Sequence, residues 1–361
     1  MTGREAQLLK WIKENPMISQ QELADRAGIT RSSAAVHISN LMKKGYIAGR
    51  GYVVSEPSYT VVVGGLNRDI GGIPYRPLVP RDSNPGKVSI SIGGVGRNIA
   101  HNMSLLDIKV SFLTALGDDE FTDVVTASCL DLGIDINKAL RVRGETSATY
   151  LFIADEHGDM EIALSDMDIF RHVTPQYLEK HRKFLDGAEA VVADTNIPEE
   201  SLAWLSENCR APLFVDPVST IKAEKIKNLL GRIHTLKPNK LEAEYLSGIK
   251  INDDESLERA TEKLLSTGLK RVFISLGSEG AYCAEGSERV KLACPEADLV
   301  NTTGGGDAFM AGLVWAWLDG RSLEESGKIG LGAGAVAVEA ETTINPEMCI
   351  EKALAKGGLK R

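Results

Sequence analysis

Short apolar runs alternate with helical patterns along the chain from residue 59 onward. The apolar runs predict strands at 59–65, 109–115, 189–194, 211–216, 232–236 and 270–276. Apolar residues spaced three or four positions apart predict helices at 97–106, 119–131, 198–208, 239–247, 254–267, 305–318 and 322–339. This alternation predicts an α/β fold with a mainly parallel sheet and helices on both faces. Ligands of such folds bind at the carboxyl ends of the strands.

Two segments interrupt the alternation and predict a small β lid. Residues 71–92 are rich in Gly and Pro, and residues 148–164 place apolar side chains on either side of a His157-Gly158 turn, as in a hairpin. Extra strands inserted into an open α/β sheet can cover a site at its edge. A lid of this kind would exclude water from the reaction.

Residues 1–55 follow a different pattern. A first helix ends at Pro16, a capping box at Ser19 and Glu22 opens a second, and a third follows a tight turn at 28–30. Residues 46–54 then alternate apolar residues around a Gly-Arg-Gly tip, which predicts a hairpin. This order is typical of a winged helix-turn-helix. We therefore predict one domain at 1–55 and a larger one at 56–361.

Charge is divided unevenly between these two regions. The chain has 41 Lys and Arg against 50 Asp and Glu, and this net charge of −9 taken alone argues against a nucleic-acid partner. Residues 1–55 nevertheless hold eight Lys and Arg and only four Asp and Glu. A basic N-terminal region before an acidic remainder predicts two separate roles.

Residues 1–55 resemble the N-terminal domains of bacterial transcription regulators. The resemblance implies that the third helix enters the major groove of DNA, with Arg31, Ser32 and His37 among its outward side chains and Arg50 at the wing tip. One such module makes few phosphate contacts, so operator binding would require a dimer. A dimerisation or protein–protein module with an incidental basic face is the alternative.

The cysteines and the hydrophobic runs predict a cytoplasmic protein without a membrane partner. The five cysteines are widely spaced and form no C-x-x-C pair, as expected of reduced thiols. Charges at Arg4 and Glu5 are unlike the start of a signal peptide. The longest apolar run, 308–318, is too short to span a bilayer.

The strongest chemical signal is the segment Asn-Thr-Thr-Gly-Gly-Gly-Asp at 301–307, which leads directly into an apolar helical pattern. Glycines at a helix N-terminus let an anion approach the unpaired N–H groups and the positive end of the helix dipole. Asp307 would repel that anion, but it could remove a proton from a hydroxyl that attacks a phosphate. The segment therefore favours phosphoryl transfer to an alcohol. A glycine-rich turn with Asp as a helix cap is the alternative.

A second glycine cluster, Gly93-Gly94-Val95-Gly96, precedes Arg97 and Asn98 at the start of the predicted helix 97–106. Asn98 offers both a hydrogen-bond donor and an acceptor. Asp69 follows the first predicted strand, and its carboxylate suits a sugar diol. Each cluster alone is explained by turn chemistry, but together with 304–307 they indicate a ligand site.

Residues 59–361 resemble the ribokinase (PfkB) family of carbohydrate kinases. The first family signature matches from Gly93 to Gly117, with Asp107 where the family usually has a small residue. The second matches at 301–307, with Asn301 in place of the usual Asp and Gly305 in place of Ala. The sequence at 237–242 matches the N-x-x-E motif, and 275–280 matches the loop that meets the nucleotide.

The resemblance implies a ribokinase-like fold, ATP and Mg²⁺ as cofactors, and a role for each matching residue. Asp307 would be the general base, and Gly304, Gly305 and Gly306 would stabilise the transferring phosphoryl group. The implied substrate residues are Asn67, Asp69, Gly93, Gly94, Asn98 and Asp168, and the implied ATP residues are Asn239, Ser275, Gly277 and Gly280. Glu242 would act on Mg²⁺ through water. Thr303 would lie at a monovalent-cation site, but Asn301 puts K⁺ activation in doubt.

Two shorter segments, 164–169 and 339–346, resemble the pseudouridine kinases more than the sugar kinases. The predicted reaction is therefore ATP-dependent phosphorylation of the 5′-hydroxyl of pseudouridine. Another nucleoside such as inosine, or a sugar in a ribokinase-like reaction, is the alternative substrate. A transcription regulator that uses a kinase fold to sense its ligand is the alternative of another class. A homodimer formed through the lid is also expected.

Overall fold

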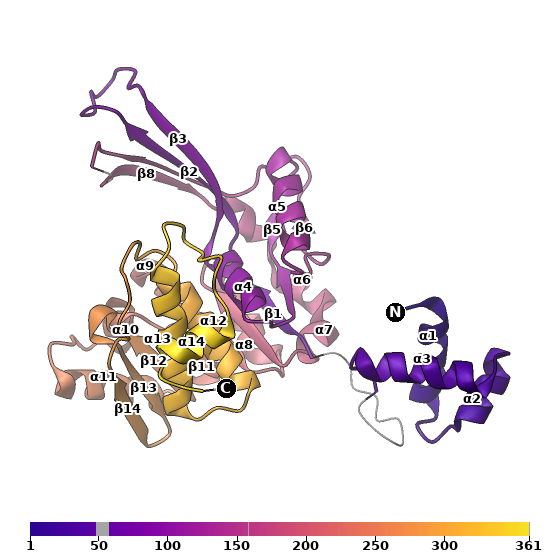
Figure 1. The fold of residues 1–361 in the computed structure, drawn as a ribbon. Helices are drawn as coiled ribbons and strands as arrows, with labels where there is room; N and C mark the ends of the chain where they lie inside the picture. The colour runs from indigo at the N-terminus through magenta and orange to yellow at the C-terminus, as the bar shows by residue number, and fades with distance from the viewer. Residues whose placement is uncertain (48–57, 158, 361) are drawn as a thin grey trace. The chain divides into compact units, whose positions relative to one another are not determined.

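The structure is a computed structural model that describes residues 1–47, 58–157 and 159–360 (Figure 1). The chain divides into two compact units, Met1–Ser58 and Tyr59–Arg361. Each unit has its own buried apolar core.

The N-terminal unit contains three helices, α1 (Gly3–Glu14), α2 (Gln20–Ala27) and α3 (Arg31–Lys43). Capping boxes open α1 and α2, and the Thr30 hydroxyl accepts a hydrogen bond from the Ser33 N–H at the start of α3. Arg31 and Ser32 are exposed. His37 is half-buried, and its Nδ1 meets no hydrogen-bond partner among the described residues, so its contact with DNA stays a prediction. Most of the predicted hairpin, with Arg50, lies outside the described residues.

The larger unit is built on an eight-stranded sheet in the order β14-β13-β12-β11-β10-β9-β1-β4. Its strands are β1 (Thr60–Val63), β4 (Val110–Leu113), β9 (Ala190–Asp194), β10 (Leu213–Asp216), β11 (Thr235–Leu236), β12 (Arg271–Ser275), β13 (Ala281–Glu285) and β14 (Glu288–Leu292). The pairings from β4 to β12 are parallel. Strands β13 and β14 add an antiparallel edge that the sequence analysis missed, because these short segments carry charged residues within the apolar run.

Helices cover both faces of this sheet, as predicted. One face packs against α4 (Val95–Leu105), α5 (Glu120–Asp131), α12 (Gly305–Leu318), α13 (Leu323–Val338) and α14 (Ile350–Lys356). The other packs against α6 (Pro175–Lys180), α7 (Arg182–Asp186), α8 (Glu199–Asn208), α9 (Thr220–Ala223), α10 (Lys240–Ser247) and α11 (Asp254–Leu265). Successive residues of β1 point to opposite faces of the sheet. Val62 packs against the helices of the first face, and Val61 and Val63 pack against those of the second.

A second sheet of four strands forms the lid, in the order β3-β2-β7-β8. Its strands are β2 (Asn67–Pro74), β3 (Gly86–Gly93), β7 (Thr149–Ala154) and β8 (Met160–Asp166). They extend away from the helical layers of the larger unit (Figure 1). The lid begins earlier than predicted, because β1 ends at Val63 and the chain passes directly into β2. Asn67 and Asp69 therefore lie on a lid strand and not at the end of the first core strand.

The two faces of the lid differ in chemistry. Asp69 pairs with Ser91 and Tyr150, and because side chains alternate along a strand these three share one face. The opposite face carries exposed apolar side chains on β3 and β8, namely Val88, Ile90, Ile162 and Leu164. Each of these four is more than half exposed. We call this set the outer lid face.

Within the described residues, no helix combines the length and the apolar character that a membrane crossing requires.

Candidate active site

Helix α12 begins at the glycine-rich segment that the sequence analysis singled out. Gly304 occupies the N-cap position in the left-handed region, with φ 87°, and no side chain caps the helix. A side chain at Gly304 would clash with the carbonyl oxygen of Thr343, so both the conformation and the space require glycine. The first N–H groups of α12 therefore remain open to a ligand.

Asp307 lies in the first turn of α12 and contacts a second helix start. Its Oδ2 accepts a hydrogen bond of 2.9 Å from the Asn98 Nδ2, although the two residues are 209 positions apart. Asn98 belongs to the first turn of α4, whose N-cap is Gly94 with φ 100° and again no side-chain cap. The two glycine-led helix starts thus meet at Asp307.

The lid brings Asp69 to the start of α4. The Asn67 Nδ2 donates a hydrogen bond of 2.6 Å to the Asp69 Oδ1, and a side chain at Gly93 would clash with the Asp69 carboxylate. Burial raises the pKa of Asp69, while the Asn67 hydrogen bond and the nearby Arg97 charge oppose that shift. The predicted residues Asn67, Asp69, Gly93, Gly94, Asn98 and Asp307 are therefore brought together by contacts.

Three further charged residues at the carboxyl ends of neighbouring strands complete this region. Asp194 ends β9 and accepts a hydrogen bond of 2.8 Å from the Gly65 N–H, and Asp216 ends β10. Lys237 follows β11, and its Nζ lies 3.1 Å from the Asp216 Oδ2. None of these three residues was predicted to have a role. Their place at the carboxyl ends of parallel strands was the signal that could have found them.

These charges shift the pKa of Asp307. Burial and the negative charge of Asp216 raise the pKa of Asp307 from 3.8 to about 7, against the lowering effects of the Asn98 hydrogen bond and the Lys237 charge. A carboxyl group with such a pKa can exchange a proton near neutral pH.

Helix α10 starts beside these residues, but its first turn is closed by its own side chains. Asn239 Oδ1 accepts from the Glu242 N–H, and Glu242 Oε2 accepts from the Asn239 N–H, each at 2.9 Å. The pair forms a capping box. Burial and the Asp216 charge raise the pKa of Glu242. The Ser275 N–H donates to the Pro238 carbonyl, so the predicted nucleotide loops lie side by side.

The loop after β12 contains two glycines in the left-handed region. Gly277 has φ 63° and Gly280 has φ 96°. A side chain at Gly280 would clash with the carbonyl oxygen of Leu292, so this loop keeps its shape only with glycine.

Two predicted site residues are not joined to this cluster. Asp168 is exposed at the start of the short 3₁₀ helix Asp168–His172, and within the described chain no side-chain contact links it to Asp69 or Asp307. Thr303 is exposed, and its N–H donates to the Asn301 Oδ1 at 2.9 Å. The Asn301 Nδ2 in turn donates to the Glu341 carbonyl.

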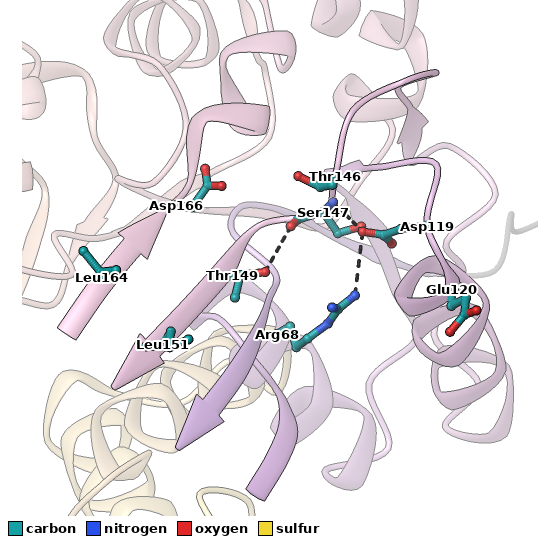
Figure 2. A pocket seen from close by; sticks show the side chains of 9 residues that line it. All are labelled: Arg68, Asp119, Glu120, Thr146, Ser147, Thr149, Leu151, Leu164 and Asp166. Carbon is teal, nitrogen blue, oxygen red and sulfur yellow. Dashed lines mark hydrogen bonds and ion pairs between the residues drawn. The ribbon is translucent and has the colours of Figure 1, made fainter. Parts of the chain in front are cut away.

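A separate cavity of about 530 Å³ lies at the root of the lid (Figure 2). Its lining residues are Arg68, Asp119, Glu120, Thr146, Ser147, Thr149, Leu151, Leu164 and Asp166. Arg68 is next to Asp69 on β2, so the two side chains lie on opposite faces of the lid. The cavity therefore does not open onto the Asp69 side.

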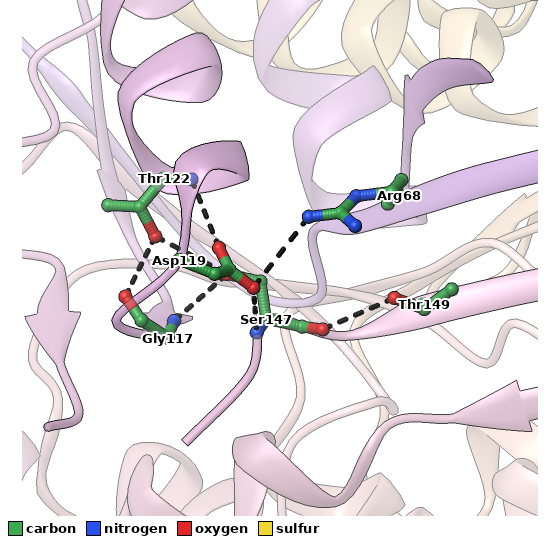
Figure 3. Close-up of polar contacts among 6 residues, drawn as sticks. All are labelled: Arg68, Gly117, Asp119, Thr122, Ser147 and Thr149. Carbon is green, nitrogen blue, oxygen red and sulfur yellow. Dashed lines mark hydrogen bonds and ion pairs between the residues drawn. The ribbon is translucent and has the colours of Figure 1, made fainter. Parts of the chain in front are cut away.

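Asp119 organises the polar contacts beside this cavity (Figure 3). Its carboxylate accepts hydrogen bonds from the Ser147 N–H at 2.8 Å and the Ser147 hydroxyl at 2.9 Å, and it pairs with Arg68 at 3.7 Å. These contacts connect β2 and the segment before β7 to the start of α5. They fix the base of the lid that carries Asp69.

Family models match both units of the chain. Residues 58–348 match the pfkB family carbohydrate kinases, and residues 4–48 match the winged helix-turn-helix DNA-binding domains. The chain belongs to the pfkB family of carbohydrate kinases. It is a phosphotransferase with an N-terminal winged helix-turn-helix domain, as the sequence analysis predicted.

Two relatives from Escherichia coli (strain K12) are similar over most of their length. The chain is 40% identical to a pseudouridine kinase over 297 residues, which is 82% of this chain and 95% of the relative. It is 38% identical to the uncharacterized sugar kinase YeiI over 98% of both chains. The match to YeiI therefore includes the N-terminal region, whereas the match to the pseudouridine kinase covers the kinase domain.

Solved structures confirm the ribokinase-like fold. A putative sugar kinase from Clostridium perfringens superposes with a TM-score of 0.77 at 33% identity, over 84% of this chain and 96% of that one. A ribokinase from Arabidopsis thaliana, solved with ribose and ATP, superposes with a TM-score of 0.73 at 22% identity, over 84% of this chain and all of that one (100%). The prediction of a mainly parallel sheet with a small lid is confirmed in its architecture.

Proposed function

We propose that this kinase transfers the γ-phosphoryl group of ATP to the 5′-hydroxyl of a nucleoside, and that the nucleoside is pseudouridine. The observation that carries the proposal is the contact of Asp307 with Asn98 at the meeting of two uncapped helix starts. A carboxylate that can accept a proton and a set of open N–H groups that can hold a phosphate lie within one turn of α12.

In the proposed reaction, Asp307 takes the proton of the 5′-hydroxyl as its oxygen forms a bond to the γ-phosphorus. The bond between that phosphorus and the bridging oxygen of ADP breaks, and ADP leaves. The N–H groups of Gly304, Gly305 and Gly306 stabilise the charge on the transferring group. The pKa of about 7 lets Asp307 act near neutral pH.

The ribose would be held from the lid and from the start of α4. Asp69, oriented by Asn67, can accept hydrogen bonds from two neighbouring hydroxyl groups, and Asn98 can hold the 5′-hydroxyl toward Asp307. Gly93 and Gly94 allow the substrate to approach the backbone. We leave Asp168 out of this set because it is exposed and lacks a contact to these residues.

The adenine nucleotide would lie along the loops that contain Asn239, Ser275, Gly277 and Gly280. Glu242 uses one carboxylate oxygen to cap α10, which leaves the other free to meet Mg²⁺ through water. Bound Mg²⁺ would neutralise charge on the phosphates. The residues fit a monovalent cation poorly, because two oxygens that could coordinate it are engaged in hydrogen bonds: the Asn301 Oδ1 accepts from the Thr303 N–H, and the Glu341 carbonyl accepts from the Asn301 Nδ2. We therefore propose that the enzyme does not depend on K⁺.

Pseudouridine is favoured by the resemblance at 164–169 and 339–346 and by the similarity to the Escherichia coli pseudouridine kinase. The test is ATP consumption by the purified full-length chain with pseudouridine, uridine, inosine, guanosine and ribose, followed by product mass. We expect the highest kcat/KM for pseudouridine. A preference for inosine or ribose would reject the substrate and keep the kinase, and turnover of no acceptor would support a ligand sensor.

A second proposed role is binding of an operator by the N-terminal domain. The matched helix-turn-helix model and the exposed Arg31 and Ser32 on α3 support it. The test is a gel shift with DNA from upstream of the gene, with and without pseudouridine, comparing wild type with Arg31→Ala. Equal mobility of the DNA with and without wild-type protein would reject this role for that DNA.

We further propose that the outer lid face joins two copies of the chain. Val88, Ile90, Ile162 and Leu164 form an exposed apolar surface on strands that already project from the core. Light scattering of wild type is expected to give a dimer, and Ile90→Asp with Leu164→Asp is expected to give a monomer. A wild-type monomer at micromolar concentration would contradict the proposal.

A further inference from the structure

Lys237 is a buried lysine that takes no part in the proposed reaction as described above. It directly follows β11, and its Nζ lies 3.1 Å from the Asp216 Oδ2. The two side chains are only 6% and 7% exposed. Burying an ion pair costs hydration energy that the pair's attraction seldom exceeds, so such a pair is weak evidence of a purely stabilising role.

The ammonium group lies against the first turn of α12. A Cβ placed ideally on Gly306 would be 3.5 Å from the Lys237 Nζ. The nitrogen therefore lies beside the open side-chain position of Gly306, in the helix turn that carries the open N–H groups. Two sources of positive potential, the ammonium and the uncapped helix start, converge on the same small space.

Surrounding carboxylates keep Lys237 protonated. Burial alone would lower the pKa of Lys237, but the charges of Asp216, Glu242 and Asp307 outweigh burial and raise it. An ammonium group has three N–H donors, and the ion pair with Asp216 uses one of them. Donor capacity remains for an acceptor at the start of α12.

We propose that Lys237 is a catalytic residue that binds a non-bridging oxygen of the phosphoryl group in transit, held in place by Asp216 as a positioning residue. This inference rests on the proposed phosphoryl transfer. Lys237 keeps its proton throughout, because the proton of the acceptor hydroxyl passes to Asp307. The ammonium stabilises the negative charge that the N–H groups of α12 also contact.

The competing explanation is structural, since the ion pair also connects the ends of β10 and β11. A structural role predicts lost stability without a change in the acid limb of the pH–rate profile. A catalytic role predicts a lower kcat on the plateau above that limb, where Asp307 is ionised, together with a moved limb, because the Lys237 charge helps to keep Asp307 ionised.

The experiment uses full-length wild type, Lys237→Met and Lys237→Arg with whichever acceptor wild type phosphorylates. Lys237→Met is expected to lower kcat by about 10²-fold or more and to move the acid limb to higher pH. Lys237→Arg, which keeps the charge, is expected to recover part of kcat and the original limb. The matched control is Lys225→Met, whose half-buried ammonium donates to the carbonyls of Thr195 and Ile197; it is expected to change melting temperature but not the limb.

Lys237→Met leaves Asp216 buried without its partner, so the double variant Lys237→Met with Asp216→Asn is prepared in parallel. It is expected to fold and to keep the low kcat, whereas the acid limb should move back to lower pH, because the Asp216 charge that raises the pKa of Asp307 is removed as well. Near-wild-type kcat with an unmoved limb in folded Lys237→Met would overturn the inference while leaving the kinase intact. A wild type that phosphorylates none of the acceptors would instead reject the proposed function, so the two failures are distinguishable.

Discussion

The starts of helices α12 and α10 differ in what they leave for a ligand. Both segments match family motifs, and both were predicted to contact the nucleotide or its metal. At α10, Asn239 and Glu242 satisfy each other's N–H groups in a capping box. At α12, Gly304 caps the helix without any side-chain hydrogen bond. The same secondary structure therefore presents a closed end in one case and an anion-binding end in the other.

The start of α4 belongs with α12 in this comparison. Its N-cap is also a glycine in the left-handed region, without a side-chain cap, and its Asn98 reaches Asp307. The starts of α4 and α12, which lack a side-chain cap, are where we expect ligand binding and catalysis. The start of α10, which has a capping box, is where we expect a contribution to stability. The following predictions test that distinction.

The largest effect is expected from Asp307→Asn. The amide keeps the shape of the side chain but cannot accept the substrate proton, so kcat should fall by about 10²–10⁴-fold while ATP still binds. Steady-state kinetics and calorimetry with ATP measure the two quantities. The matched control is Asp319→Asn at the exposed far end of the same helix, which should retain kcat. An Asp307→Asn enzyme with normal kcat would remove Asp307 as the base.

The next effect is expected from a pair of glycine substitutions in α12. Gly306→Ala adds a methyl group 3.5 Å from the Lys237 Nζ without backbone strain, so kcat should fall by about 10²-fold with melting temperature kept. Gly304→Ala should lose stability, because residue 304 has φ 87° and its side chain would clash with Thr343. Unchanged kcat in Gly306→Ala would mean that the start of α12 does not hold the phosphate.

A smaller effect is expected from pH. Asp307 must be ionised to accept a proton, so kcat should fall about tenfold per pH unit below a limb near the pKa of about 7. Stability should move the other way. The folded pKa lies above the usual 3.8, so stability from the protonated form is full at low pH and is lost as pH rises toward 7. Asp307→Asn should abolish that loss in melting curves recorded from pH 5 to pH 8.

The smallest effect is expected at the capped start of α10. Asn239→Ala should lower the free energy of unfolding by about 1 kcal/mol, and Asn239→Asp should restore it because Asp also caps helices. Denaturant unfolding measures this difference. If the Asn239 side chain instead contacts phosphate, Asn239→Asp would raise the KM for ATP through repulsion, and the distinction between open and capped ends would not hold.

Local patterns in the sequence were sufficient to predict much of the fold. Apolar runs located the strands from β1 to β12 of the core because a buried parallel strand is apolar on both faces. The glycines before α4 and α12 were visible because few other residues adopt the left-handed backbone found at Gly94 and Gly304. The antiparallel pair β13 and β14 was missed, and so was the place of Asp69 on the lid, because neither depends on local periodicity alone.

The sequence by itself determined the class of fold, the two regions and the identity of the glycine-led segments. Only the tertiary structure decided which side chains meet, namely Asn98 with Asp307 and Lys237 with Asp216, and that Glu242 closes its own helix. The physical reason is that helix and strand periods act over a few residues, whereas these contacts arise where parallel strands far apart in sequence end at one edge of the sheet.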